Sequence, residues 1–404
     1  MNDVILPDQQ VHRGHHARIV LIVMDGLGGL PHPESGKTEL EVAHTPNLDA
    51  LADRSSLGVL DPVARGITPG SGPGHLSLFG YDPTRYVIGR GALSALGVGI
   101  DLQPGDLAAR LNLATFDAAG RVVDRRAGRP DDEEARRVVE KVNRELRQPE
   151  GYTISLTHEK EHRVVLLIRG PGLAAHLTDT DPLETGVPDL PCRATDPDSE
   201  RAAELVRDFL RQAREILADE AALNGFLARG FAAYETIPTL AQRFGLETAR
   251  AFAKYPMYRG VSRLVGMEVP AVPESARETV ELYREHGEDA EFSFLHFKDT
   301  DTRGHDGDFA GKVAAIQEVD ALLPRVLEME PDVLIITGDH STPALYKEHS
   351  WHAVPVLLAS PWARPTAAEF GEASCRLGDL GRFHGTELMS LALAHAGRLI
   401  KYGA

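Results

Sequence analysis

The stretch RIVLIVMDGLGG, residues 18–29, decides the fold because its apolar run, IVLIVM, ends at Asp25. Two other segments have the same design: FSFLHF precedes KDTDTRGHDG, residues 298–307, and VLIIT precedes GDHS, residues 338–341. Short runs rich in β-branched and aromatic residues are typical of strands buried on both faces of a parallel sheet. Ligands of open α/β sheets bind at the carboxyl ends of such strands, so we expect these acids to meet along one edge.

This expected edge carries carboxylates and imidazoles from distant segments: Asp25, Asp301, His305, Asp339 and His340, followed by His349 and His352 in KEHSWHAVPVLL. Carboxylates packed closely repel one another unless cations neutralise them. Mixed oxygen and imidazole donors suit zinc, manganese, iron or cobalt better than calcium. A single Asp before a Gly usually marks a turn or a helix cap. Three strands that all end in this way predict a metal centre instead, with enough donors for two ions.

The composition, 42% hydrophobic and 25% charged residues in a chain of 404, is that of a globular protein with two domains. The net charge of −17 disfavours a nucleic-acid partner, whereas a few arginines in a pocket could still bind a small anion. No segment has the ~20 apolar residues of a membrane span, and no signal-peptide layout is evident, so we expect a cytoplasmic protein without a membrane partner. Cys192 and Cys375 lack CxxC spacing and predict no cysteine site.

The middle of the chain predicts a second α/β domain. Strand-like patterns occur at residues 110–116, 120–126, 152–158 and 162–170, and helical spacing occurs at 131–146 and 199–223. The acid-tipped strands resume only later in the chain. We therefore expect a sheet domain made of residues 1–103 and 259–404, interrupted by an inserted α/β domain of residues 104–258.

Ser71 lies in a glycine-dense loop, GITPGSGPGHLSLFGYDP, residues 66–83, which then becomes apolar with helical spacing. A serine hydroxyl becomes a nucleophile when a base or a metal favours its alkoxide. A helix N-terminus also provides positive potential that suits a phosphate. The alternative is that Ser71 only caps the helix.

Together these motifs resemble the alkaline phosphatase superfamily and, within it, the archaeal-type 2,3-bisphosphoglycerate-independent phosphoglycerate mutases. The resemblance extends over most of the chain through TPNLDALA (45–52), IGRGALSALGVGIDL (88–102), GRVVDRRAGR (120–129), LTDTDP (177–182) and YPMYRGVSRLVGMEV (255–269). It implies an alkaline-phosphatase-like sheet domain with helices on both faces and an inserted substrate-binding domain. It also implies an isomerase of glycolysis and gluconeogenesis that interconverts 3-phosphoglycerate and 2-phosphoglycerate through a phosphoserine, without 2,3-bisphosphoglycerate.

The resemblance assigns roles to the metal-centre residues. Ser71 would be the phosphorylated nucleophile and would contact one metal ion together with Asp25, Asp339 and His340. A second ion would be held by Asp301, His305 and His349. His352 stays open as a substitute or extra ligand, because the residues before VP depart from the family pattern. Manganese is expected first, with cobalt, zinc or magnesium as alternatives, since availability decides among them.

The resemblance also implies that RRAGR contacts the substrate through Arg125, Arg126 and Arg129, with Lys254, Arg259 and Arg263 as further candidates. Planar guanidinium groups bind phosphate and carboxylate bidentately, which suits a small phosphorylated carboxylate. Three arginines in five residues could equally form a solvated strand edge. The sequence leaves open whether the chain forms a homo-oligomer.

Other functions stay open. A metal-dependent phosphomonoesterase, a phosphonate hydrolase, or a phosphotransferase acting on another hydroxylated metabolite such as homoserine would share the metal residues. A sulfatase is disfavoured because Ser71 lies in GSGPG, without a C/S-x-P-x-R motif. A metal-binding protein without catalysis is disfavoured because the nucleophile candidate and all candidate ligands are present.

Overall fold

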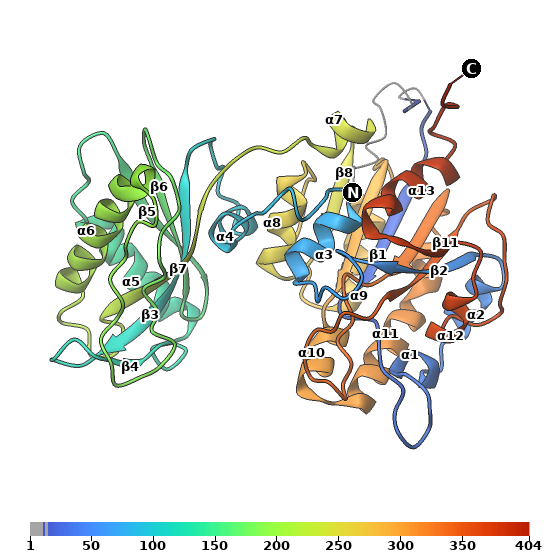
Figure 1. Ribbon diagram of the computed structural model, residues 1–404, viewed down its shortest axis with the longest axis horizontal. Coiled ribbons are helices and arrows are strands. Elements are labelled where there is room, and N and C mark those ends of the chain that lie inside the picture. The colour runs from blue at the N-terminus through green and yellow to red at the C-terminus, as the bar shows by residue number, and fades with distance from the viewer. Residues whose placement is uncertain (1–10, 13–14, 404) are drawn as a thin grey trace. The chain divides into compact units, whose positions relative to one another are not determined.

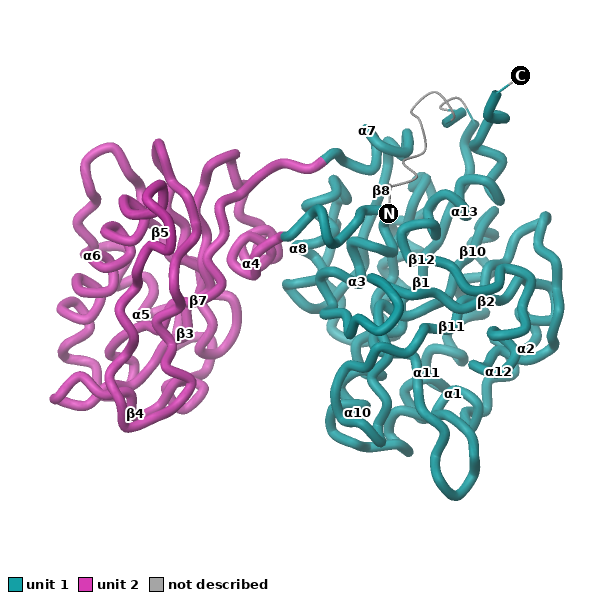
Figure 2. Tube along the Cα trace, in the orientation of Figure 1, with its two compact units in different colours: residues 1–87, 238–404 teal, residues 88–237 magenta. Residues whose placement is uncertain are grey.

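The computed structural model describes residues 11–12 and 15–403, which form two compact units (Figure 2). Unit 1 comprises the chain up to Val87 and from Pro238 onward, and unit 2 comprises Ile88–Ile237. The chain is therefore a domain interrupted by an insertion.

The described part of unit 1 contains a seven-stranded sheet (Figure 1). The strand order is β12 (Gly381–His384), β2 (Ser56–Asp61), β11 (Val354–Ala359), β10 (Val333–Thr337), β1 (Ile19–Met24), β9 (Phe292–Phe297) and β8 (Ala249–Phe252). The three acid-tipped strands are neighbours: β1 lies between β10 and β9 and runs parallel to both. Every residue of these three strands is buried. Their apolar runs therefore form the centre of the sheet, and their carboxyl ends share one edge.

Helices cover both faces of this sheet (Figure 1). On one face, Phe294 of β9 contacts Phe79 at the end of α3. On the other face, Tyr283 of α9 contacts Phe252 of β8. Phe252 pairs with Leu295, the residue that follows Phe294 in β9, so it lies on the face opposite Phe294. The helices of unit 1 are α1 (Glu39–Val42), α2 (Pro46–Ala52), α3 (Ser71–Leu78), α7 (Leu240–Phe244), α8 (Pro256–Leu264), α9 (Ala276–His286), α10 (Asp299–Asp306), α11 (Phe309–Leu327), α12 (Glu372–Arg376) and α13 (Leu388–His395).

Unit 2 is built on an antiparallel sheet around β3 (Leu107–Phe116). This strand pairs with β6 (Arg163–Arg169), β7 (Gly225–Ala233) and, at its end, β4 (Val122–Asp124), and β6 also pairs with β5 (Thr153–Lys160). Alternate residues of β3, among them Leu107, Ala109 and Leu111, join an apolar core with α5 (Asp132–Glu145) and α6 (Glu200–Ile216). The intervening residues of β3 face the other side.

The boundaries of the insertion differ from the expected 104–258. Helix α4 (Arg90–Gly97) belongs to unit 2 because it packs on β3: a Cβ at Gly91 would lie 2.4 Å from the carbonyl oxygen of Ala108. At the other end, β8 pairs with β9 and α8 follows it, so both elements belong to unit 1. The helix expected at 199–223 ends earlier, at Ile216. No described helix is long and apolar enough to cross a membrane.

Candidate metal centre

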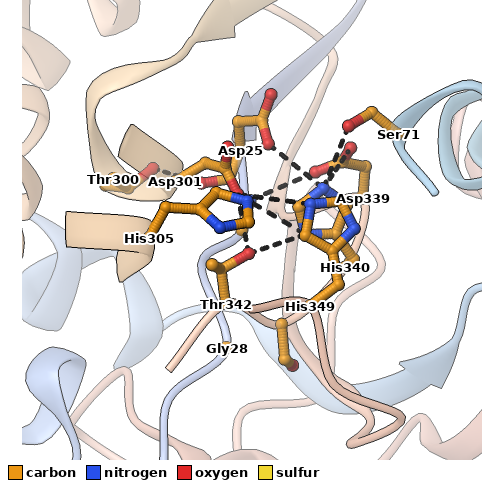
Figure 3. Close-up of polar contacts among 12 residues, drawn as sticks. Asp25, Gly28, Ser71, Thr300, Asp301, His305, Asp339, His340, Thr342 and His349 are labelled. Atoms are coloured by element: carbon orange, nitrogen blue, oxygen red, sulfur yellow. Dashed lines mark hydrogen bonds and ion pairs between the residues drawn. The ribbon is translucent and has the colours of Figure 1, made fainter. Parts of the chain in front are cut away.

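The carboxyl ends of β1, β9 and β10 bring the expected acids together (Figure 3). Asp25 follows β1, Asp301 lies in the first turn of α10 after β9, and Asp339 and His340 follow β10. All four side chains are buried. The local sequence explains this arrangement, because the acids follow the strands closely: Asp25 comes directly after β1, Asp339 after β10 with one residue between, and Asp301 in the helical turn after β9.

The first group consists of Asp25, Asp339 and His340, whose candidate ligand atoms lie within 4.8 Å of one another. His340 Nε2 is 3.3 Å from Asp25 Oδ1 and 3.2 Å from Asp339 Oδ2. Both oxygens are buried and accept no hydrogen bond within the described residues. Buried carboxylate oxygens without a donor are costly unless a cation neutralises them, so this group fits a divalent metal ion.

The surroundings keep the first group in the ionisation state that a metal requires. Burial alone would raise the pKa of Asp25, but Lys298 and His296 hold that pKa well below its usual range. The pKa of Asp339 is also lowered: burial and Asp25 would raise it, and His340 opposes them. Burial lowers the pKa of His340, which favours the neutral imidazole that metal binding requires.

The second group consists of Asp301, His305 and His349, again with candidate ligand atoms within 4.8 Å of one another. His305 Nδ1 lies 3.1 Å from the carbonyl of Lys347, and His349 Nδ1 lies 2.8 Å from the carbonyl of Pro69. A carbonyl only accepts hydrogen bonds, so each Nδ1 carries the proton and each Nε2 presents a lone pair. These two Nε2 atoms lie 3.5 and 3.6 Å from Asp301 Oδ1. The donors therefore converge, and this group also fits a metal ion.

Ser71 lies beside both groups. Its Oγ is 3.1 Å from His340 Nε2, and the ring of His340 stacks on that of His349 with the centroids 3.6 Å apart. The alternative of a helix-capping serine is wrong, because Gly70 occupies the N-cap and Ser71 is the first residue of α3. The close approach of α3 to Asp339 depends on Gly74, because a Cβ at this position would lie 2.3 Å from the carbonyl oxygen of Asp339.

His352 lies outside both groups of the described residues. Its Nδ1 is 3.0 Å from Ser350 Oγ, and its ring stacks on Trp351 at 4.9 Å. The structure therefore brings His349, not His352, toward Asp301.

Comparison with known proteins supports the resemblance noted in the sequence. The family model described as 2,3-bisphosphoglycerate-independent phosphoglycerate mutase matches residues 52–222. A probable 2,3-bisphosphoglycerate-independent phosphoglycerate mutase from Thermus thermophilus is 51% identical over 392 residues, which cover 96% of each chain. The chain belongs to this family. Another probable mutase, from Deinococcus radiodurans, is 46% identical to this member over 100% of both chains.

Two solved structures share the fold of this phosphoglycerate mutase family member. A protein from Pyrococcus horikoshii matches with a TM-score of 0.81 and 31% identity, covering 96% of this chain and 100% of that one. The cofactor-independent phosphoglycerate mutase from Thermoplasma acidophilum matches with a TM-score of 0.71 and 29% identity, covering 94% and 100%. The family and the α/β fold expected from the sequence are thereby confirmed.

Several residues of this mutase-family site were missed by sequence reasoning. Lys298 Nζ lies 3.0 Å from Asp25 Oδ2 and also donates to Asp301 Oδ2, so it bridges the two groups. Burial alone would lower the pKa of Lys298, but these two carboxylates raise it. Thr342 Oγ1 donates to Asp301 Oδ1 at 2.7 Å. The signal available in the sequence was the position of Lys298 directly after FSFLHF.

The basic residues expected to bind substrate lie in different environments and in both units. Arg125 donates two hydrogen bonds to Asp181, at 2.7 and 2.8 Å, so its guanidinium is already engaged. Arg126 and Arg129 are exposed in the turn after β4. The other three candidates lie in unit 1, outside the insertion: Lys254 donates to the carbonyl of Glu274, and Arg259 and Arg263 belong to α8.

Unit 2 also contains an arginine cluster that the sequence did not reveal, made of Arg110 (β3), Arg163 (β6) and Arg229 (β7). All three lie on the face of the sheet opposite α5 and α6, since their strand neighbours form the helix-covered core. Each has a buried Nε without a hydrogen-bond partner among the described residues. Burial lowers the pKa of Arg110 to about 10, because the opposing effect of the Glu159 carboxylate is outweighed by burial together with Arg163 and Arg229. Three partly buried cations that share a face are suited to bind an anion.

Proposed function

We propose that this chain interconverts 3-phosphoglycerate and 2-phosphoglycerate through a phosphoserine at Ser71. The supporting observation is the Ser71 hydroxyl, 3.1 Å from His340 Nε2 beside two groups of metal donors. The names of the relatives at 51% and 46% identity support the same substrate. On this proposal the protein is a cytoplasmic enzyme of glycolysis and gluconeogenesis.

In the proposed site, Ser71, Asp25, Asp339 and His340 hold one divalent ion, and Asp301, His305 and His349 hold the other. Manganese is the expected ion at both, since mixed carboxylate and imidazole donors suit it and need no cysteine. When bound, the two ions would favour the Ser71 alkoxide and neutralise charge on the transferred phosphoryl group.

The proposed reaction has two transfers. The Ser71 hydroxyl loses its proton and its Oγ attacks phosphorus, the bond between phosphorus and the 3-oxygen of phosphoglycerate breaks, and that oxygen takes a proton. The 2-hydroxyl of the retained glycerate then loses its proton and attacks the phosphoserine, which restores Ser71. Retention of glycerate decides the outcome, because attack by water would release inorganic phosphate instead.

The arginine cluster of unit 2 is proposed to bind the carboxylate of the substrate. Arg110, Arg163 and Arg229 each offer a buried Nε–H without a partner among the described residues, whereas Arg125 is held by Asp181. The exposed Arg126 and Arg129 remain candidates for the same anion. Fork-shaped guanidinium groups bind carboxylates bidentately, which suits this task.

The test is a coupled assay of 3-phosphoglycerate conversion with Mn²⁺ and without bisphosphoglycerate, run on the wild type, Ser71→Ala and Ser77→Ala. Ser71→Ala should lose roughly 10⁴-fold or more in kcat, as nucleophile removal does elsewhere. Ser77 lies on the same helix, and its Oγ has no hydrogen-bond partner in the described residues, so Ser77→Ala is the matched control. Undiminished turnover by Ser71→Ala would refute the phosphoserine mechanism. Release of glycerate and phosphate would identify a phosphomonoesterase.

A further inference from the structure

Two buried histidines, His75 of α3 and His296 of β9, lie directly behind the first group. Their side chains are inaccessible to solvent, and their ring centroids are 5.2 Å apart. Neither belongs to a candidate metal group of the described residues. Each ring directs one nitrogen toward the site, and the other nitrogen, His75 Nε2 or His296 Nδ1, has no hydrogen-bond partner within the described chain.

His296 acts on Asp25. Its Nε2 lies 3.0 Å from Asp25 Oδ2, and because an ionised carboxylate only accepts hydrogen bonds, Nε2 is the donor. The ring is held by stacking on Tyr258, with the centroids 3.7 Å apart and the planes 26° apart. This contact engages Oδ2, whereas Asp25 Oδ1 faces His340 and has no hydrogen-bond partner in the described part of the chain.

His75 acts on the nucleophile and on Asp339. Its Nδ1 lies 2.8 Å from the backbone carbonyl oxygen of Ser71 and 3.2 Å from Asp339 Oδ2. The carbonyl oxygen can only accept a hydrogen bond, so Nδ1 carries the proton. Asp339 Oδ2 is a close charge contact of the same N–H group and not its hydrogen-bond partner. One imidazole N–H therefore faces both the first residue of α3 and a carboxylate of the first group.

Packing alone does not account for these two histidines. Their neighbours are aromatic, with Phe294 5.5 Å from His75 and 5.9 Å from His296 between ring centroids. A phenylalanine would fill such a site without burying a ring nitrogen that lacks a partner. The feature that only histidine supplies is one N–H on a rigid ring, directed at Asp25 in one case and at Ser71 and Asp339 in the other.

We infer that His75 and His296 are positioning residues for the metal centre, and that each acts through one specific ring nitrogen. His296 orients Asp25 through Nε2, and His75 fixes the Ser71 backbone and Asp339 through Nδ1. The inference rests on the metal site of the proposed function. Residues that hydrogen-bond to metal ligands commonly change metal affinity 10- to 100-fold when they are replaced.

The test exploits the difference between asparagine and glutamine. The amide nitrogen of asparagine reaches the place of histidine Nδ1, and that of glutamine reaches the place of Nε2. Mn²⁺ is titrated calorimetrically into the metal-free full-length wild type and into His75→Asn, His75→Gln, His296→Asn and His296→Gln. His296→Gln and His75→Asn should stay within about threefold of the wild-type Kd, whereas His296→Asn and His75→Gln should bind 10- to 100-fold more weakly.

The two positions should therefore show opposite preferences, with glutamine tolerated at position 296 and asparagine at position 75. A role in packing would not produce this pattern, because size alone would favour the same amide at both positions. His395→Asn serves as the control, since His395 lies outside both metal groups and bonds Ser360 instead. Near-UV circular dichroism reports folding, and if one pair of variants fails to fold, the comparison at the other position decides. Equal affinity of all variants would overturn this inference alone. Failure of the wild type to bind Mn²⁺ would overturn the proposed function with it.

Discussion

Replacement of Lys298 by methionine should destabilise the metal-free protein much more than the metal-loaded protein. Lys298 Nζ lies 3.0 Å from Asp25 Oδ2, contacts Asp301 Oδ2 and donates to the Tyr258 hydroxyl at 2.8 Å. Without metal, this ammonium is a main source of positive charge between the two buried carboxylates. Methionine keeps most of the side-chain volume and removes only that charge.

The magnitude follows from the burial of the partners. Removing one member of a fully buried ion pair typically costs 3–5 kcal/mol, because the other charge is left without compensation. The Lys298 side chain is 19% exposed, so water offsets part of this loss. We expect about 2–3 kcal/mol in the metal-free protein, which corresponds to roughly 4–12 °C in Tm for a unit of this size. Saturating Mn²⁺ should reduce the difference to below about 1 kcal/mol, since cations then neutralise the same carboxylates.

The assay is differential scanning calorimetry of EDTA-treated protein, before and after addition of Mn²⁺. Lys254→Met is the matched control, because the ion pair of Lys254 with Glu274 is solvent-exposed and should contribute less than about 1 kcal/mol. An equal loss of Tm with and without Mn²⁺ would refute the reasoning. So would an unchanged Tm in the metal-free Lys298→Met protein.

Three further predictions concern separate parts of the molecule. Asp301→Asn should lower bound Mn²⁺ from two equivalents toward one by elemental analysis; full metal content would show that the second group is wrongly assigned. Arg110→Met should raise KM for 3-phosphoglycerate by about 10- to 100-fold with metal content unchanged, as expected for a guanidinium that binds an anion; an unchanged KM would remove the arginine cluster from the substrate site. Burial raises the pKa of Asp181, but the hydrogen bonds from Arg125 lower it on balance. Stabilisation by this pair is therefore present above about pH 4 and is lost as the pH falls through the lower folded-state value. Arg125→Met should flatten the decline in Tm of unit 2 between about pH 5 and pH 3, and an unaltered decline would contradict the assignment.

The convergence of the acids at one edge of the sheet was the most predictable part of the structure. Burial on both faces makes β1, β9 and β10 continuous apolar runs, and the residue that ends each run lies at the sheet edge. Asp25, Asp301 and Asp339 could therefore be placed without knowledge of the strand order. Helix α4 was harder to assign, because its apolar positions fit either unit, and only its close packing on Ala108 settles the question.

The remaining site residues could not be predicted for physical reasons. His75 and His296 lie in mainly apolar, buried segments, where a packed core histidine is the ordinary interpretation. Arg110 and Arg229 are far apart in sequence and meet only through the register of β3 with β7. Arg125 was expected to contact substrate, but its guanidinium donates to Asp181 of LTDTDP. That contact depends on tertiary structure.

The carbonyl partners of His305 and His349 bear on how the proposed second metal site would acquire its ion. Because Lys347 and Pro69 hold the Nδ1 atoms of these rings, the orientation of both imidazoles is set when the chain folds. Binding of an ion at the second group then requires little loss of side-chain freedom, and exchange of one ion for another requires no rearrangement of the rings. We therefore expect metal exchange to be limited by dehydration of the incoming ion, so that the occupant reflects the supply of divalent cations around the protein.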